Sequence, residues 1–195
     1  MSTSCVLAPA ALDHLRLATE WRLLALAFEC PGMTWQAQMD ELRGEVEDAD
    51  LRQLPDCARQ EAAPELYHTT FGPGGPAAPR EVSYVRSIQP GQLIADIQAF
   101  YDAFAYCPAI DEPPDHVAVE LGFVSYLHLK AAYAISCGDD EHSATAIDAA
   151  SRFTEYHLSG VAVPLAKLLV TSEVRYLSLA ATAMLRRLAH GVHVP

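Results

Sequence analysis

The chain has 195 residues, of which 51% are hydrophobic and 19% are charged, and its formal net charge at pH 7 is -12. This length and apolar content suit one folded domain and exclude a disordered acidic chain. The shortage of Lys and Arg argues against nucleic-acid binding, which needs clustered basic side chains to neutralise phosphates. An acidic surface instead favours solubility or a cationic partner.

The sequence also bears on compartment and redox state. No apolar run is long enough to span a bilayer, and residues 1–11 lack the basic start and apolar core of a signal peptide. We therefore expect a cytoplasmic protein with no membrane insertion. Scattered thiols without a Cys-x-x-Cys pair indicate reduced cysteines, with no disulfide framework, metal site or other cofactor. These cysteines are Cys5, Cys30, Cys57, Cys107 and Cys137.

Apolar residues recur at helical spacing along the first 70 residues. The stretches with this pattern are 17–28, 35–46 and, more weakly, 56–70. Each predicts an amphipathic helix with one face toward a core. Pro31-Gly32 separates the first two stretches, and the acidic run 45–50 is interpreted as a solvated helix end.

Residues 71–90 are rich in glycine and proline, which interrupt regular secondary structure. The sequence predicts one long loop here, and loops of this length in compact domains are often functional or disordered. The segment 82–85 resembles a strand, but no partner strand is evident elsewhere. The glycines do not form a phosphate-binding loop, because the Gly-Lys-Ser/Thr ending is missing and no strand precedes them.

Helical patterns resume after the loop. The predicted segments are 94–104, 115–137, 139–157, a short piece at 165–170 and a last helix over 172–190. Pro108 and Pro113-Pro114 bracket a linker, so 105–115 is a candidate hinge. The resulting prediction is an all-α, single-domain bundle over residues 1–195, with about seven to nine helices and one long Gly/Pro-rich loop.

The segment Pro113-Pro114-Asp115-His116 is the most informative stretch. The two prolines end any preceding helix, and Asp115 stands where a side chain can cap the following helix. His116 is a titratable group that a helix cap does not require, so it indicates a site. His116 and Glu120 are four residues apart and share a helix face.

Two interpretations of the His116 and Glu120 pair stay open. One is a metal or general-base site, with His68 or His128 as a third ligand, which would make a small metal-dependent hydrolase. The other, which the sequence favours, is a hydrogen bond within the helix. Catalysis has little support elsewhere, because no Gly-x-Ser-x-Gly elbow exists and Cys107 lies at a helix end that disfavours a thiolate.

A binding site is the remaining possibility. A long loop packed on a helical bundle beside the Asp115 helix would make a groove. Five aromatic residues could line it or simply belong to the core: Tyr67, Phe71, Tyr84, Tyr101 and Tyr106.

Four motifs together resemble one family. They are Leu66-Tyr67-His68-Thr69-Thr70-Phe71-Gly72-Pro73, Pro79-Arg80-Glu81-Val82-Ser83-Tyr84, Glu112-Pro113-Pro114-Asp115-His116 and Glu120-Leu121-Gly122-Phe123. Their order and spacing, over about residues 61–133, are similar to the TorD/DmsD/NarJ chaperones of molybdenum enzymes, also called redox enzyme maturation proteins. The loop is most similar to the branch that serves dimethyl sulfide, selenate, chlorate or ethylbenzene dehydrogenases.

The resemblance implies an all-α chaperone that has no catalytic activity of its own. It implies binding to the N-terminal leader, often a twin-arginine signal peptide, and to the apo form of a molybdopterin oxidoreductase catalytic subunit. The chaperone would hold that subunit until its cofactor is inserted and export can proceed. It would be a monomer or a dimer that exchanges helices. A helical scaffold or regulatory protein is the other non-enzymatic alternative.

The resemblance also assigns roles to residues of this chain, with Asp115 as the acidic partner of the peptide. The implied peptide-binding positions are Asp115, His116, Glu120, Tyr67, Phe71 and Gly72. The implied loop-structuring positions are Pro73, Glu81, Ser83, Tyr84 and Pro114. Gly122 and Val124 depart from the larger residue and the Met common in relatives, so the peptide preference does not carry over.

Overall fold

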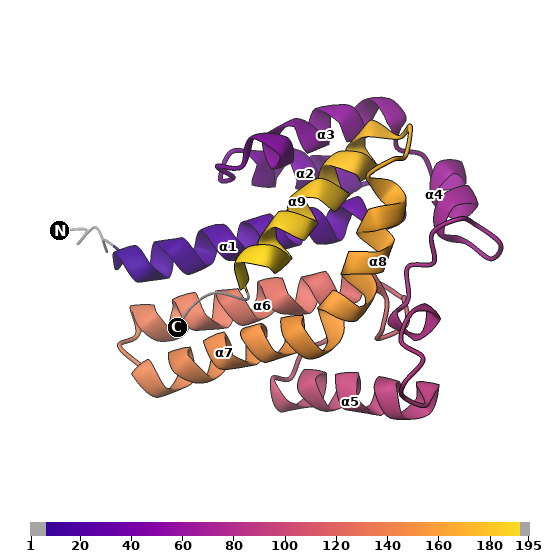
Figure 1. The fold of residues 1–195 in the computed structure, drawn as a ribbon. Coiled ribbons are helices and arrows are strands. Elements are labelled where there is room, and N and C mark those ends of the chain that lie inside the picture. Colours follow the sequence, from indigo (N-terminus) through magenta and orange to yellow (C-terminus); the bar gives the residue numbers. More distant parts are fainter. Residues whose placement is uncertain (1–6, 192–195) are drawn as a thin grey trace.

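The structure is a computed structural model that describes residues 7–191, so Cys5 and the two extreme ends of the predicted domain lie outside it. Helix α6 (Val117–Ser136) is its central element and lies beside α1 (Pro9–Ala27) (Figure 1). Pro9 begins α1, where its missing N–H has no helical partner to lose. Because α6 is apolar on most of its surface, neighbouring helices must cover it from several sides.

Helix α7 (Asp140–Phe153) runs back along α6. Gly138, with φ of +72°, makes the turn between them, and the Asp139 side chain caps α7 by accepting from the His142 N–H. The chain then continues through a π-helical turn, η2 (Thr154–Leu158), into α8 (Ser159–Leu169). The predicted break before a short segment at 165–170 is therefore wrong.

The reason lies at Gly160, which stands between the two predicted segments 139–157 and 165–170. A Cβ there would lie 2.7 Å from Glu81 Oε1 and 3.0 Å from a methyl group of Val85. Gly160 is thus a site of close packing between α8 and the long loop, and not a helix end.

Helices α2 (Trp35–Arg43), α3 (Ala49–Glu61) and α9 (Arg175–Gly191) close the other side of α1 (Figure 1). The predicted helix over 56–70 is two helices, α3 and α4 (Pro64–Phe71), because Pro64 opens the second one. The acidic run 45–50 is not a helix end. It leads into α3, whose cap is the Asp48 side chain, which accepts from the N–H groups of Asp50 and Leu51 at 2.9 and 3.2 Å.

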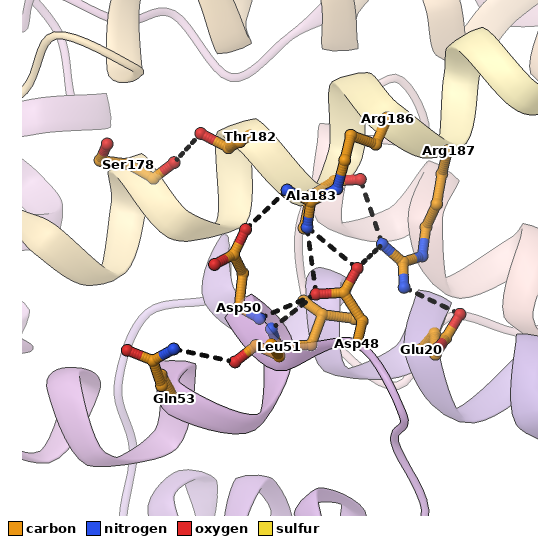
Figure 2. Close-up of polar contacts among 11 residues, drawn as sticks. Glu20, Asp48, Asp50, Leu51, Gln53, Ser178, Thr182, Ala183, Arg186 and Arg187 are labelled. Atoms are coloured by element: carbon orange, nitrogen blue, oxygen red, sulfur yellow. Dashed lines mark hydrogen bonds and ion pairs between the residues drawn. The ribbon is translucent and has the colours of Figure 1, made fainter.

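Ion pairs join α9 to the start of α3 and to α1, a cluster that we call the clasp (Figure 2). Arg186 contacts Asp50 at 2.6 Å and Asp48 at 2.9 Å. Arg187 contacts Glu20 at 2.8 Å and Asp48 at 3.3 Å. Burial by itself would raise the pKa of Asp48, but the Leu51 N–H and the two arginines bring that pKa below its usual value.

Helix α5 (Pro90–Ala103) completes the bundle and contributes to an aromatic core. Tyr101 of α5 contacts Phe123 of α6 and Phe153 of α7, with ring centroids 4.8 and 5.9 Å apart. Residues 7–191 contain α1 to α9 and no β-strand, so the predicted all-α class and helix number are confirmed. No helix in this range is long and apolar enough to cross a membrane.

Candidate functional site

Residues 72–89, which we call the strap, join α4 to α5 and lie across the start of α6. The Glu81 N–H donates to the Asp115 carbonyl at 2.9 Å, and the Val117 N–H donates to the Pro79 carbonyl at 2.8 Å. Arg80 and His116 thereby form an isolated antiparallel bridge. The segment 82–85 is not a strand. Its first part belongs to a 3₁₀ turn, η1 (Glu81–Ser83). The backbone of the strap pairs with Asp115 and His116, the two residues before α6.

Asp115 does not cap α6, which corrects the expectation from its position. The cap is His116, whose Nδ1 accepts from the Ala118 N–H at 3.2 Å. The Asp115 carboxylate turns to the strap, where Oδ2 accepts from the Val82 N–H at 3.2 Å. Its other oxygen, Oδ1, accepts from Nε and Nη2 of Arg80 at 2.9 and 2.7 Å. Asp115 is 0% exposed, whereas the Arg80 side chain is 41% exposed.

Both ring nitrogens of His116 have partners. Since Nδ1 accepts from the backbone, Nε2 carries the proton and donates to the Tyr67 hydroxyl at 3.2 Å. The Tyr67 hydroxyl in turn donates to Glu112 Oε1 at 3.1 Å. Burial lowers the pKa of His116, against the opposing effect of Glu112 and Asp115, and so favours the neutral ring that this network requires.

This network corrects the two interpretations of His116 and Glu120. His116 has no nitrogen left for a metal or for Glu120, and both Glu120 oxygens lack a hydrogen-bond partner in the structure. The proposed third ligands lie elsewhere: His68 is exposed, and His128 stacks on His14 with their Nδ1 atoms 3.1 Å apart. Within residues 7–191, no group of three or more His, Cys, Asp or Glu side chains could hold a metal ion.

Two more buried carboxyl groups lie near Asp115. Glu81 and Glu120 are both 0% exposed. Burial raises the pKa of each, with a further increase from Asp115, and for Glu120 also from Glu81. His157 of η2 partly offsets the increase at Glu81, since its Nδ1 lies 3.4 Å from Glu81 Oε2, within ion-pair distance. Among residues 7–191 no cation faces Glu120 in this way, so burial favours its neutral, protonated form.

The predicted wall residues lie beside this centre, at the end of α4. Tyr67 and Phe71 contact each other, and each is only 6% exposed. At Gly72, a Cβ would lie 2.3 Å from the His68 carbonyl oxygen, so glycine allows the strap to leave α4 closely against the last turn. Pro73 follows on the surface.

The predicted loop-structuring residues differ in what they contact. Glu81 is buried against α8, and the Tyr84 hydroxyl donates to the Ala78 carbonyl at 2.7 Å, inside the strap. The Pro114 carbonyl accepts from the Tyr101 hydroxyl at 2.8 Å. Ser83 is exposed, and its backbone N–H donates to the Arg80 carbonyl. Of the candidate groove aromatics, Tyr101 is a core residue, and Tyr84 and Tyr106 are partly buried.

Sequence reasoning missed three participants: Arg80, Glu112 and His157. Arg80 and Glu112 were within the quoted motifs, but nothing in their spacing paired them with Asp115 or Tyr67. A signal was present for Arg80, since Arg80 and Glu81 are charged residues that directly follow a stretch, residues 72–79, made only of Gly, Pro and Ala. His157 ends the predicted helix over 139–157, and no local pattern links it to Glu81.

Comparison with known proteins assigns the chain to a family. A family model described as "Nitrate reductase delta subunit" matches residues 35–161, which is more than half of the 195 residues. The chain belongs to the nitrate reductase delta subunit family. This family consists of chaperones for the maturation of molybdoenzymes, and the match includes the strap, Glu112, Asp115 and His157. Searches of the curated proteins and of the solved structures return no match.

Proposed function

We propose that this protein is a cytoplasmic chaperone dedicated to one molybdopterin oxidoreductase. It binds the N-terminal leader of the catalytic subunit, of the twin-arginine type, and holds the apo subunit while the cofactor is inserted. The similarity of the strap to the branch for dimethyl sulfide, selenate, chlorate or ethylbenzene dehydrogenases suggests a client of that group.

The observation that carries this proposal is the buried Asp115 carboxylate under the strap, inside the segment that matches the family. A twin-arginine leader has a basic start followed by an apolar segment. Glu112 is partly exposed and accepts from the Tyr67 hydroxyl beside His116, so it offers a carboxylate to a basic segment next to Asp115. Exposed ion pairs contribute about 0–1 kcal/mol each and mainly steer binding.

Apolar contacts must supply most of the affinity, at roughly 25 cal/mol per Å² of buried apolar surface. Tyr67 and Phe71 are the nearest candidates, and both are nearly covered in the free chain. A leader would therefore gain apolar area from them only if the strap shifts. The proposal thus requires a displacement of residues 72–89 on binding.

Titration of the purified chain with a labelled synthetic twin-arginine leader, monitored by fluorescence anisotropy, tests the proposal. We expect binding at micromolar concentration and a loss of about tenfold or more in Asp115→Asn, which removes the charge but keeps an oxygen for Val82. Asp111→Asn is the matched control, since Asp111 is exposed and lies in the same linker. The proposal fails if neither the leader nor the tagged apo subunit binds the wild-type chain.

A further inference from the structure

The Arg80–Asp115 pair has an unusual distribution of exposure. Two guanidinium N–H groups of Arg80 converge on Oδ1 of Asp115, while Oδ2 is held by the Val82 N–H of the strap backbone. Asp115 is completely covered, yet the Arg80 side chain keeps 41% of its surface in solvent. The carboxylate is therefore fixed by the fold, whereas the guanidinium reaches it from the surface.

Within residues 7–191, the surroundings offer no cation other than Arg80 to Asp115. Glu81 and Glu120 are buried near Asp115, and among the described residues neither carboxyl has a hydrogen-bond partner. His157 faces Glu81 at 3.4 Å, and His116 is held neutral by its own hydrogen bonds. Arg80 is thus the cation that directly satisfies Asp115, and removing it would leave a buried carboxylate unpaired, which is strongly unfavourable.

We propose that Asp115 is a guanidinium-binding site, which Arg80 fills in the free chain and an arginine side chain of the bound peptide takes over. This inference rests on the proposed function for the identity of the peptide, but not for the site itself. Arg80 is then an internal substitute for the ligand. It keeps the strap closed until an arginine arrives.

The exchange is energetically reasonable because one guanidinium replaces another on the same carboxylate. The ion pair is conserved, and the released Arg80 needs little additional hydration because it is already half-exposed. A lysine ammonium is a poorer replacement, since it is a compact, strongly hydrated point charge without the planar fork of donors. The site therefore discriminates arginine from lysine.

Chemical rescue tests the site without any leader. In Arg80→Ala we expect a lower melting temperature that propylguanidinium restores by roughly 3–5 °C at about ten times its dissociation constant. Propylammonium should restore much less. The wild-type chain, whose site is filled, should not respond. Arg86→Ala, which removes an exposed arginine of the same strap, is the matched control and should show neither the loss nor the rescue.

The synthetic leader tests the exchange itself. Arg80→Ala should bind the twin-arginine leader about tenfold more tightly than the wild-type chain, because no internal competitor has to be displaced. The gain should be smaller for a leader in which both arginines are lysines. If Arg80→Ala is too unstable to purify, Arg80→Gln with the same two probes provides the same test.

The outcomes separate the two proposals. Rescue by propylguanidinium without leader binding to either protein would support the site and overturn the proposed function. Leader binding to the wild-type chain, with no rescue and with unchanged or weaker binding to Arg80→Ala, would support the function and overturn the exchange. Equal rescue by propylguanidinium and propylammonium would also overturn it, because a site for any cation would not require Arg80's fork of donors.

Discussion

Asp48 and Asp115 both stand near a helix start and accept from arginine, yet they differ in their tasks. Asp48 caps α3 and also joins the clasp with Arg186 and Arg187 (Figure 2). Asp115, two residues before α6, leaves the cap to His116 and holds Arg80 and the strap. The side chain of Asp48 is 18% exposed, whereas that of Asp115 is 0% exposed.

The number of arginines is the more instructive difference. Two arginines share Asp48, so the loss of either one leaves the carboxylate paired. Among the described residues Asp115 accepts from one arginine, Arg80, which a loop carries and not a helix. In the clasp, two arginines on a helix hold Asp48, which suits a contact that closes the bundle permanently. A single arginine on the strap holds Asp115, which suits a contact in which another arginine can replace it. The same residue types thus serve fixed architecture in one place and a replaceable contact in the other.

Among the substitutions that test this comparison, Asp115→Ala should have the largest effect on stability. The change removes the acceptor of Val82 and the partner of Arg80, so we expect a loss of about 3 kcal/mol in the free energy of unfolding. This figure is at the low end for a buried pair because the remaining Arg80 can be hydrated. Urea denaturation measures the loss, and trypsin should cleave the strap faster, at Arg80 or Arg86.

Asp48→Ala should cost about 2 kcal/mol, from the lost cap and the lost ion pairs. Because the clasp joins α9 to α3 and α1, whereas the strap contacts the start of α6 and α8, tryptic cleavage at Arg80 and Arg86 should not change beyond the effect of global destabilisation. A strap that opens selectively in Asp48→Ala would contradict the independence of the two regions. Urea denaturation with parallel proteolysis checks both statements.

The sequence predicted the helices and the long loop, but not the ion pairs of the clasp. Helical periodicity identified the main helices, because a helix that buries one face shows this in the spacing of its own apolar residues. The predicted break around Gly160 was wrong because a distant contact with Glu81 decides the local structure, and the acidic run 45–50 was misjudged because Asp48 caps the helix that follows it. The motif identified Asp115 and His116 as site residues, but it assigned the helix cap to Asp115, whereas the structure assigns the cap to His116. The pairing of Asp115 with Arg80 spans 35 residues and follows from where the strap lies.

A third prediction concerns Glu120, the buried carboxyl group that is held protonated. Burial raises the pKa of Glu120 in the folded chain, so the folded state keeps a proton that the unfolded state loses above its ordinary pKa of about 4.3. Stability therefore falls as pH rises from that value toward the raised pKa, by at most about 1.4 kcal/mol per pH unit. Glu120→Gln should remove this slope. Melting temperatures of the two proteins should coincide most closely near pH 4 and diverge in favour of Glu120→Gln toward pH 8.

Glu81 and Asp115 titrate close to Glu120, so a control for their contribution is needed. In Glu81→Gln the Glu120 slope should persist and begin at the same pH, but it should end at a lower pH, because the loss of one neighbouring carboxyl lowers the folded-state pKa of Glu120. If the slope of the wild-type chain survives unchanged in Glu120→Gln, the protonated acid under the strap is another residue. That result would leave the Arg80–Asp115 geometry intact and would assign the retained proton to a different carboxyl group.

The smallest expected effect is that of Arg186→Gln, and it tests the redundancy on which the comparison depends. The Arg186 side chain is 42% exposed, and Asp48 keeps Arg187 when Arg186 is removed. We expect a loss below about 1 kcal/mol, smaller still in high salt because exposed ion pairs are screened. Urea denaturation at low and high ionic strength measures it beside Arg80→Gln, whose loss should be larger and less sensitive to salt because Asp115 is buried. Equal losses would mean that the number of arginines on a carboxylate does not distinguish the clasp from the strap.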